Sequence, residues 1–210
     1  MPITRKDVDR ACSGTAWDLG NSILYDLCKK YPEHKSDDVI LAKILIIGRV
    51  YAAAIERRKA ITERGDDFYL GNVLPKIKAS NIDDWIRGLG KSVDDNEESI
   101  LCVHSCVTRL FNSISGQDKR SLASKYLHFH RPDLFFIYDE RALAGVRILT
   151  PRMRADLSQY DQVKIDKDYA SFFVRCLMVR KRIQKSFQRM VTPRELDNVL
   201  IMFSDRNLAP

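Results

Sequence analysis

The sequence lacks the marks of a membrane-bound or secreted protein. None of its apolar runs reaches the roughly 20 uninterrupted residues that a membrane-spanning helix requires, because even VILAKILIIGRVYAAAI contains Lys43 and Arg49. The N-terminal stretch MPITRKDVDR is polar and contains no apolar signal core. We therefore expect a protein of the cytoplasm that has no membrane partner.

The sequence also lacks paired cysteine motifs. Its five cysteines are odd in number and irregularly spaced, which indicates reduced thiols rather than a disulfide framework. Cys102, His104 and Cys106 form a close group of metal-binding residue types, but a helix would turn His104 away from both cysteines. His128 and His130 would diverge in the same way. We therefore favour structural roles for these residues over a zinc site, and expect neither a metal nor a cofactor.

Common catalytic motifs are missing as well. The sequence has no GxxxxGK[ST] phosphate-binding loop and no GxSxG nucleophile elbow. It has no cluster of acidic residues that would form the two-metal site of a nuclease. A nuclease is therefore disfavoured.

Positive charge is in excess and unevenly distributed. The net charge is +7, and the run VRCLMVRKRIQKSFQR contains no acidic residue, whereas DDNEES is wholly polar and acidic. Arg175, Arg182 and Lys185 recur in the basic run at roughly helical spacing. This stripe is either a surface that binds a polyanion such as DNA or a solvated helix face, and both interpretations stay open.

Helical patterns cover most of the chain. Residues that favour the N-cap position precede apolar, helically periodic segments at Ser36, Asn81, Asn96, Asp166 and Thr192. The segment from Ser36 predicts a long, mostly buried helix of about six turns. Thr192 predicts a capping box with Glu195, and Pro193 takes the first helical position.

These signals predict an all-α protein of about eight to ten helices. We expect a single domain over residues 1–210, or two lobes with the site between them. Residues 65–78 predict a loop with a short helix around Pro75. LFFIY is a short, isolated stretch with β character.

Asp139 stands in an unusual setting, within NSISGQDKRSLASKYLHFHRPDLFFIYDERA (Asn112 to Ala142). It follows the apolar segment FFIY and precedes the helical pattern ERALAG. Such an aspartate can act simply as an N-cap. Alternatively, a helix start can hold a carboxylate in a pocket, where it stabilises a cationic transition state.

The same stretch resembles the helix-hairpin-helix DNA glycosylase superfamily, in particular its 8-oxoguanine glycosylase-like branch. The family pattern is a glycine-containing hairpin, a lysine, a helix, a proline and an aspartate at the start of the next helix. Here SGQDK takes the hairpin, with Gly116 at its turn and Lys119 at the lysine position. Pro132 and Asp139 follow, with Asp139 twenty residues after Lys119. Two departures are that Asp118 replaces the second hairpin glycine and that no proline directly precedes the aspartate.

The resemblance implies a set of site residues. Asp139 would be the catalytic carboxylate, and Lys119 or Lys125 would be the lysine that can form a Schiff base. Gly116, Gln117 and Arg120 of the hairpin region would contact DNA, together with the stripe residues Arg175, Arg182 and Lys185. Their residue types, rather than the resemblance, make Tyr51, Tyr126 and Tyr138 candidates for the pocket of the flipped base, with simple core packing as the alternative. Arg49, in an apolar helical pattern, requires either an internal carboxylate or a bound base or phosphate.

The expected function is accordingly that of a DNA glycosylase, which would act as a monomer on double-stranded DNA containing a modified base. It would cleave the N-glycosidic bond and leave an abasic site, with or without lyase activity. Two uses follow from the resemblance: repair of oxidised purines, or excision of a modified base from phage DNA in the bacterial cytoplasm. The alternative from another class is a non-enzymatic helical DNA-binding protein in which Asp139 only caps a helix.

Overall fold

The computed structural model describes residues 2–94 and 96–208 and is helical throughout. Its elements are α1 (Arg5–Ala11), α2 (Ala16–Lys30), α3 (Asp37–Val50), α4 (Gly65–Phe68), the π-helical turn η1 (Tyr69–Val73), α5 (Leu74–Lys78), α6 (Ile82–Arg87), α7 (Glu97–Ser115), α8 (Arg120–His130), α9 (Glu140–Leu149), α10 (Lys167–Phe187) and α11 (Pro193–Leu208). Because α4, η1 and α5 are continuous, the described residues form ten separate helices and no strand. The prediction of an all-α fold is confirmed.

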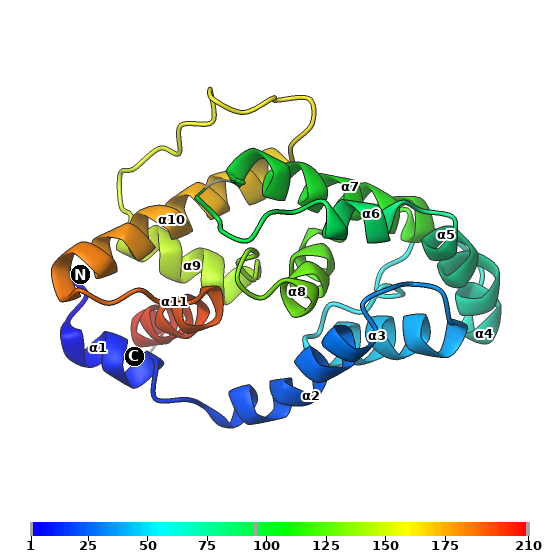
Figure 1. Cartoon of the computed structure of the whole chain (residues 1–210), viewed down its shortest axis with the longest axis horizontal. Helices are drawn as coiled ribbons and strands as arrows, with labels where there is room; N and C mark the ends of the chain where they lie inside the picture. The colour runs from blue at the N-terminus through cyan, green and yellow to red at the C-terminus, as the bar shows by residue number, and fades with distance from the viewer. Residues whose placement is uncertain (1, 95, 209–210) are drawn as a thin grey trace.

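The helices pack in two groups, which the chain between α8 and α9 joins (Figure 1). The groups also touch where His104 of α7 stacks on Tyr169 of α10. In one group α8 packs against α2, α3 and α7, and α5 and α6 pack beside α7. In the other, α9 packs against both α10 and α11, and α1 packs against α11. One apolar core runs through both groups. The segment that joins α8 to α9 crosses between the groups and therefore places the start of α9 at their junction.

Local capping chemistry explains several helix starts. Asp166 caps α10 by accepting from the backbone N–H groups of Asp168 and Tyr169. Thr192 and Glu195 form the predicted reciprocal pair at the start of α11, with backbone-to-side-chain distances of 2.7 and 3.1 Å. These starts confirm the predictions, because a cap depends on residues that lie within one turn of each other.

Two predicted boundaries were wrong. The helix that starts after Ser36 ends at Val50 instead of continuing for six turns. Directly beyond it Ala52 adopts a left-handed conformation (φ 51°), and the backbone N–H of Ala53 donates to the carbonyl of Gly48 at 2.7 Å. The chain thus reverses over Gly48, whose missing side chain leaves room for this approach. Residues 65–78 were predicted as a loop with a short helix around Pro75. The short helix is present as α5, but residues 65–73 are helical too, so the segment is one continuous helix with Phe68 buried in its first turn.

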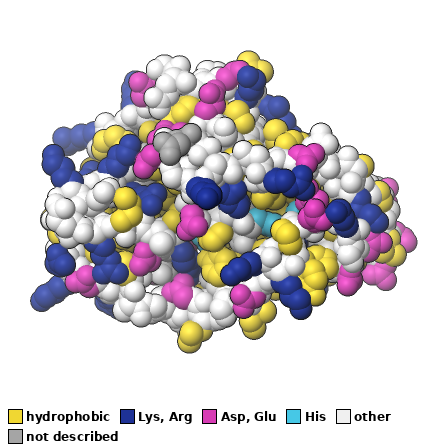
Figure 2. Space-filling model, in the orientation of Figure 1, with side chains coloured by type: hydrophobic (Ala, Val, Ile, Leu, Met, Phe, Trp, Pro, Cys, Tyr) yellow, Lys and Arg dark blue, Asp and Glu magenta, His cyan; other side chains and the backbone are white. Residues whose placement is uncertain are grey.

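Within the described residues, no helix combines the length and the apolar character needed to cross a membrane. On the face drawn in Figure 2, Lys and Arg side chains are spread among acidic side chains rather than gathered in one continuous block. Positive charge is therefore dispersed over this face.

Candidate functional site: two clefts that meet at Asp139

A well-anchored segment holds Asp139 in place. At its start the guanidinium of Arg131 donates to the carbonyl of Ile86 at 3.2 Å. Near its end the backbone N–H of Tyr138 donates to the hydroxyl of Ser124 at 3.0 Å. Since both anchors belong to the α2–α8 group, the position of Asp139 is fixed relative to α8.

The two carboxylate oxygens of Asp139 have different surroundings. Oδ1 accepts from the backbone N–H of Ala142 at 2.9 Å and caps α9, as predicted. Oδ2 lies 3.6 Å from Nζ of Lys125, and 29% of the Asp139 side chain is exposed. One oxygen therefore serves the helix, and the other faces a lysine in an accessible place.

Lys125 is buried beside this carboxylate. Its Nζ donates to the carbonyl of Tyr51 at 3.2 Å and to the hydroxyl of Ser121 at 3.1 Å. It also lies 5.7 Å from the centroid of the Tyr51 ring. Burial lowers the pKa of Lys125, and the negative charge of Asp139 partly offsets that effect. Burial thus favours the neutral amine, which is the nucleophilic form of lysine.

The predicted hairpin lies between α7 and α8. Gly116 adopts a left-handed conformation (φ 69°) directly after α7, and a Cβ at this position would lie 2.7 Å from Cβ of Ala60. Lys119 precedes α8, and its Nζ donates to the carbonyl of Arg57. Burial lowers the pKa of Lys119 as well. Of the two lysine candidates, Lys125 is the one whose ammonium is paired with Asp139.

A first cleft of about 720 Å³ opens between the hairpin and the start of α9; we call it the hairpin cleft. Both lysine candidates and Asp139 line it. Its other polar walls include Arg57, Arg58, Gln117, Arg120 and Tyr138. Arg57 and Arg58 are exposed, so the outer part of this cleft presents cationic side chains to solvent.

A second cleft of about 760 Å³ lies on the opposite side of Asp139, against α11; we call it the α11 cleft. Four residues belong to both clefts, namely Tyr51, Ala52, Asp139 and Arg141. The remaining walls of the α11 cleft include Trp17, Asp197, Asn198, Ile201 and Met202. Asp139 is therefore the carboxylate at the junction of a cationic cleft and a largely apolar one.

Asp197 is a buried carboxylate in the α11 cleft that the sequence interpretation did not identify. It is 3% exposed, and its Oδ2 accepts from Arg194 at 2.6 Å. Arg194 also pairs with Asp18 at 2.7 Å, so one guanidinium serves two carboxylates. Burial raises the pKa of Asp197 to about 7, and the negative charge of Asp139 adds to this shift. Oδ1 of Asp197 has no hydrogen-bond partner among the described residues.

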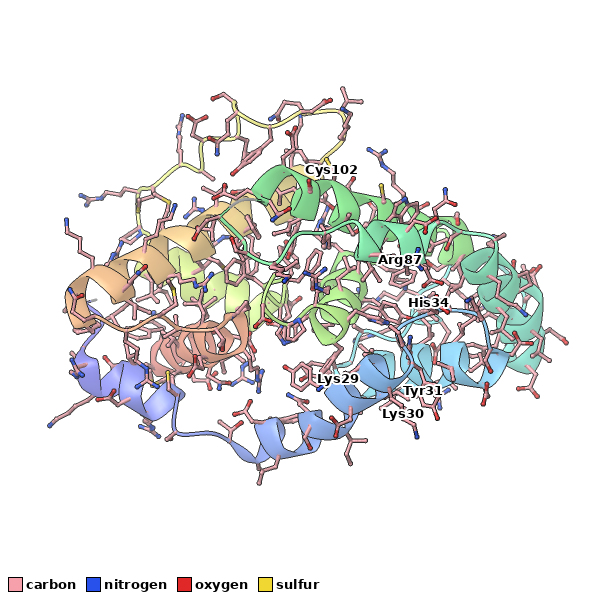
Figure 3. All side chains as sticks on the ribbon, viewed as in Figure 1. Lys29, Lys30, Tyr31, His34, Arg87 and Cys102 are labelled. Carbon is pink, nitrogen blue, oxygen red and sulfur yellow. The ribbon has the colours of Figure 1, made fainter. Side chains whose placement is uncertain are left out.

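The structure separates the residues expected in the base pocket. Tyr51 and Tyr138 line the hairpin cleft. Tyr126 is fully buried instead, and its hydroxyl lies 2.6 Å from Nε2 of His34, which is labelled in Figure 3. Arg49 is 63% exposed on its side chain and lies 3.5 Å from Glu56. Tyr126 and Arg49 therefore have internal partners and line neither cleft.

The residues expected to contact DNA lie in two separate places, the hairpin cleft and helix α10. Gln117 and Arg120 line the hairpin cleft, although Arg120 also pairs with Asp166 at 2.7 Å. Arg175 and Arg182 lie at the opposite end of α9, where they donate to the carbonyls of Thr150 and Leu149 at 3.2 and 2.9 Å. Lys185 is exposed on α10, the helix that also carries both arginines. The stripe on α10 is thus separate from the cleft that contains Asp139.

The residues considered for a zinc site do not surround a common point in the described part of the chain. His104 is fully buried and stacks on Tyr169, with ring centroids 3.5 Å apart. Among the described residues no group of three His, Cys, Asp or Glu side chains is placed to hold a metal ion. His128 is also buried, and its Nδ1 lies 2.8 Å from the carbonyl of Phe135.

No protein-family model, curated protein or solved structure was found to match this chain.

Proposed function

We propose that the protein is a DNA glycosylase that excises a modified base. The observation that carries this proposal is the position of Asp139 at the junction of the two clefts, beside the buried Lys125 and close to the α7–α8 hairpin. The hairpin and Asp139 follow the residue order of the glycosylase family that the sequence resembles, whereas Lys125 lies six residues beyond Lys119, which occupies the family's lysine position.

The chemistry assigns a role to each group. As the bond between C1′ and the base nitrogen breaks, its electron pair leaves with the base and positive charge develops on the sugar. The carboxylate of Asp139 would stabilise that charge, as carboxylates do in other glycosyl transfers. A water that adds to C1′ would then complete hydrolysis and transfer its proton to a carboxylate.

Lys125 supplies a second route to the same products. A neutral amine can form a bond from Nζ to C1′ as the bond to the base breaks and its electron pair leaves with the base. The amine then loses a proton and the sugar ring opens to a Schiff base. Water hydrolyses this Schiff base to the abasic site, or β-elimination of the 3′ phosphate cleaves the strand. The lowered pKa of Lys125 supports this route, and its contact with Asp139 makes it a better candidate than Lys119. Borohydride trapping of a covalent adduct distinguishes attack by Lys125 from attack by water.

The hairpin cleft would hold the DNA backbone. Its exposed rim residues Arg57 and Arg58 carry positive charge, and Lys119 and Arg120 lie farther inside. Phosphate contacts of this kind fix the register of a protein on a duplex without reading its sequence.

The direct test is incubation of the protein with duplexes that carry different modified bases, followed by alkali to cleave at abasic sites. Natural phage DNAs with modified bases and oligonucleotides with oxidised purines should be tested in parallel, because they distinguish defence from repair. Strand cleavage after alkali supports the proposal. Binding of these duplexes without release of any base would instead support a non-enzymatic DNA-binding protein, in which the bond from Asp139 to Ala142 is purely structural.

A further inference from the structure

Burial of the Asp197 carboxylate carries an unfavourable desolvation free energy. A buried carboxylate needs hydrogen-bond partners for both oxygens, because desolvation without compensation is unfavourable. Arg194 satisfies Oδ2 at 2.6 Å, whereas Oδ1 has no partner in the described part of the chain. Asp197 lines the α11 cleft, and its Oδ1 is almost fully covered in the cleft wall, so a bound ligand with a hydrogen-bond donor at this wall would supply the missing partner.

The surroundings of Asp197 fit a flat, partly apolar ligand. Trp17 and Tyr51 lie at the cleft with ring centroids 6.2 Å apart, and Ile201 and Met202 add apolar surface. Aromatic and aliphatic walls of this kind stack on nucleobases. A volume of about 760 Å³ also lies within the range that accommodates ligands larger than a bare base.

The charges of the two clefts distinguish their ligands. Three of the four arginines that line the α11 cleft pair with carboxylates: Arg141 with Asp205 at 2.5 Å, Arg206 with Asp7 at 2.6 Å, and Arg194 with Asp197 at 2.6 Å. An anionic phosphate therefore gains little there, whereas the rim of the hairpin cleft is cationic. With the sugar at Asp139, the base belongs on the α11 side and the phosphates on the hairpin side.

We propose that the α11 cleft receives the extruded base, and that Asp197 selects a base whose outer edge carries a hydrogen-bond donor such as an N–H or hydroxyl group. This inference rests on the proposed glycosylase function. It assigns Asp197 as a specificity-determining residue, with Arg194 as the positioning residue that orients its carboxylate.

The test measures binding, so that it does not depend on excision. Affinities are measured in an Asp139→Asn background for two matched pairs of duplexes, 5-hydroxymethylcytosine against 5-methylcytosine and 8-oxoguanine against 8-methylguanine. In each pair the first base has an extra donor. At a pH well above the pKa of about 7 of Asp197 its carboxylate is ionised, and the protein should then prefer the donor-bearing member of at least one pair by about tenfold or more, since a hydrogen bond to a charged group contributes that much. Asp197→Asn should abolish that preference.

A second variant guards against misfolding of Asp197→Asn. Ile201→Trp fills the α11 cleft one turn from Asp197 without removing the pair with Arg194. It should also abolish the preference, whereas the control Val163→Trp, at a residue that is 79% exposed, should retain it.

The outcomes separate this inference from the proposed function. If neither pair is discriminated, or if both cleft variants keep the preference, the assignment of Asp197 is wrong even where base release continues. If discrimination is lost in both variants but no duplex ever releases a base, the recognition site stands and the glycosylase proposal fails.

Discussion

At Asp139, one carboxylate oxygen caps α9 and the other faces Lys125, so a single substitution can separate structure from chemistry. Asparagine caps helices as well as aspartate does, so Asp139→Asn should keep the fold. It removes the negative charge, and excision should fall at least about 100-fold, since each loss of about 1.4 kcal/mol slows a reaction tenfold. Abasic-site formation and duplex binding should be measured together. Wild-type excision by this variant would remove Asp139 from the mechanism.

The two lysines can be distinguished by borohydride trapping on substrate DNA. If the enzyme forms a Schiff base, the covalent adduct should disappear in Lys125→Gln and persist in Lys119→Gln, because Lys125 is the lysine paired with Asp139. The yield should increase with pH as the amine of Lys125 loses its proton, and its lowered pKa moves this increase below the range of an ordinary lysine. Loss of the adduct in Lys119→Gln alone would reverse the assignment. Base release without any adduct would identify water as the nucleophile.

At the scale of helices, Asp139 caps α9 and Asp197 lies in α11, so the geometry of the site depends on how closely these two helices pack. A Cβ added at Gly145 of α9 would lie 2.0 Å from the carbonyl oxygen of Leu200 in α11. Gly145→Ala should therefore lower the free energy of unfolding by about 1–3 kcal/mol or more, as overpacking does. The matched control is Gly20→Ala, where an added Cβ meets nothing within 4 Å, and which should raise the stability of α2 by about 0.5–1 kcal/mol. Denaturant unfolding of both variants measures the difference, and equal stabilities would contradict this account of the packing.

The bounds of the helices show which structural features can be predicted from the sequence. The starts of α9, α10 and α11 were predictable, because each cap is made by residues within one turn of one another. The end of α3 was not predictable, because the reversal after Val50 depends on distant contacts: the Tyr51 carbonyl accepts from Lys125, and Ala60 donates to the Ser115 carbonyl at 2.8 Å. Local propensity is readily overridden by such tertiary contacts.

The residues of the candidate site also differ in whether the sequence alone could identify them. The resemblance pointed to Asp139 and to two lysines, since these residues belong to one continuous stretch of the sequence. It could not rank the lysines, because the contacts that bury Lys125 come from another part of the chain. Asp197 and Arg194 gave only a weak signal, an acid and a base three residues apart in a helix. Their importance comes from burial beside α2 and from the cleft that they share with Asp139.

At the scale of the whole molecule, two basic regions compete as the track for DNA. The rim of the hairpin cleft presents Arg57 and Arg58 close to Asp139, whereas the stripe on α10 lies at the other end of α9. Each region has one arginine that also donates to a backbone carbonyl, Arg182 to Leu149 in the stripe and Arg57 to Ala52 at the rim, so this contact does not separate them. A duplex whose flipped base reaches Asp139 must pass over the rim, but it need not reach the stripe.

Salt dependence decides between these tracks. Each phosphate contact contributes about −0.9 to the slope of log affinity against log salt concentration. Arg57→Gln with Arg58→Gln should therefore flatten the slope by about two units and weaken binding to all duplexes alike, without changing base preference. The matched double variant Arg182→Gln with Lys185→Gln removes the same charge from the α10 stripe and should change the slope less. The opposite result, a flattened slope for the stripe variant and an unchanged slope for the rim variant, would place the duplex along α10 and would require that the base approach Asp139 from the α11 side.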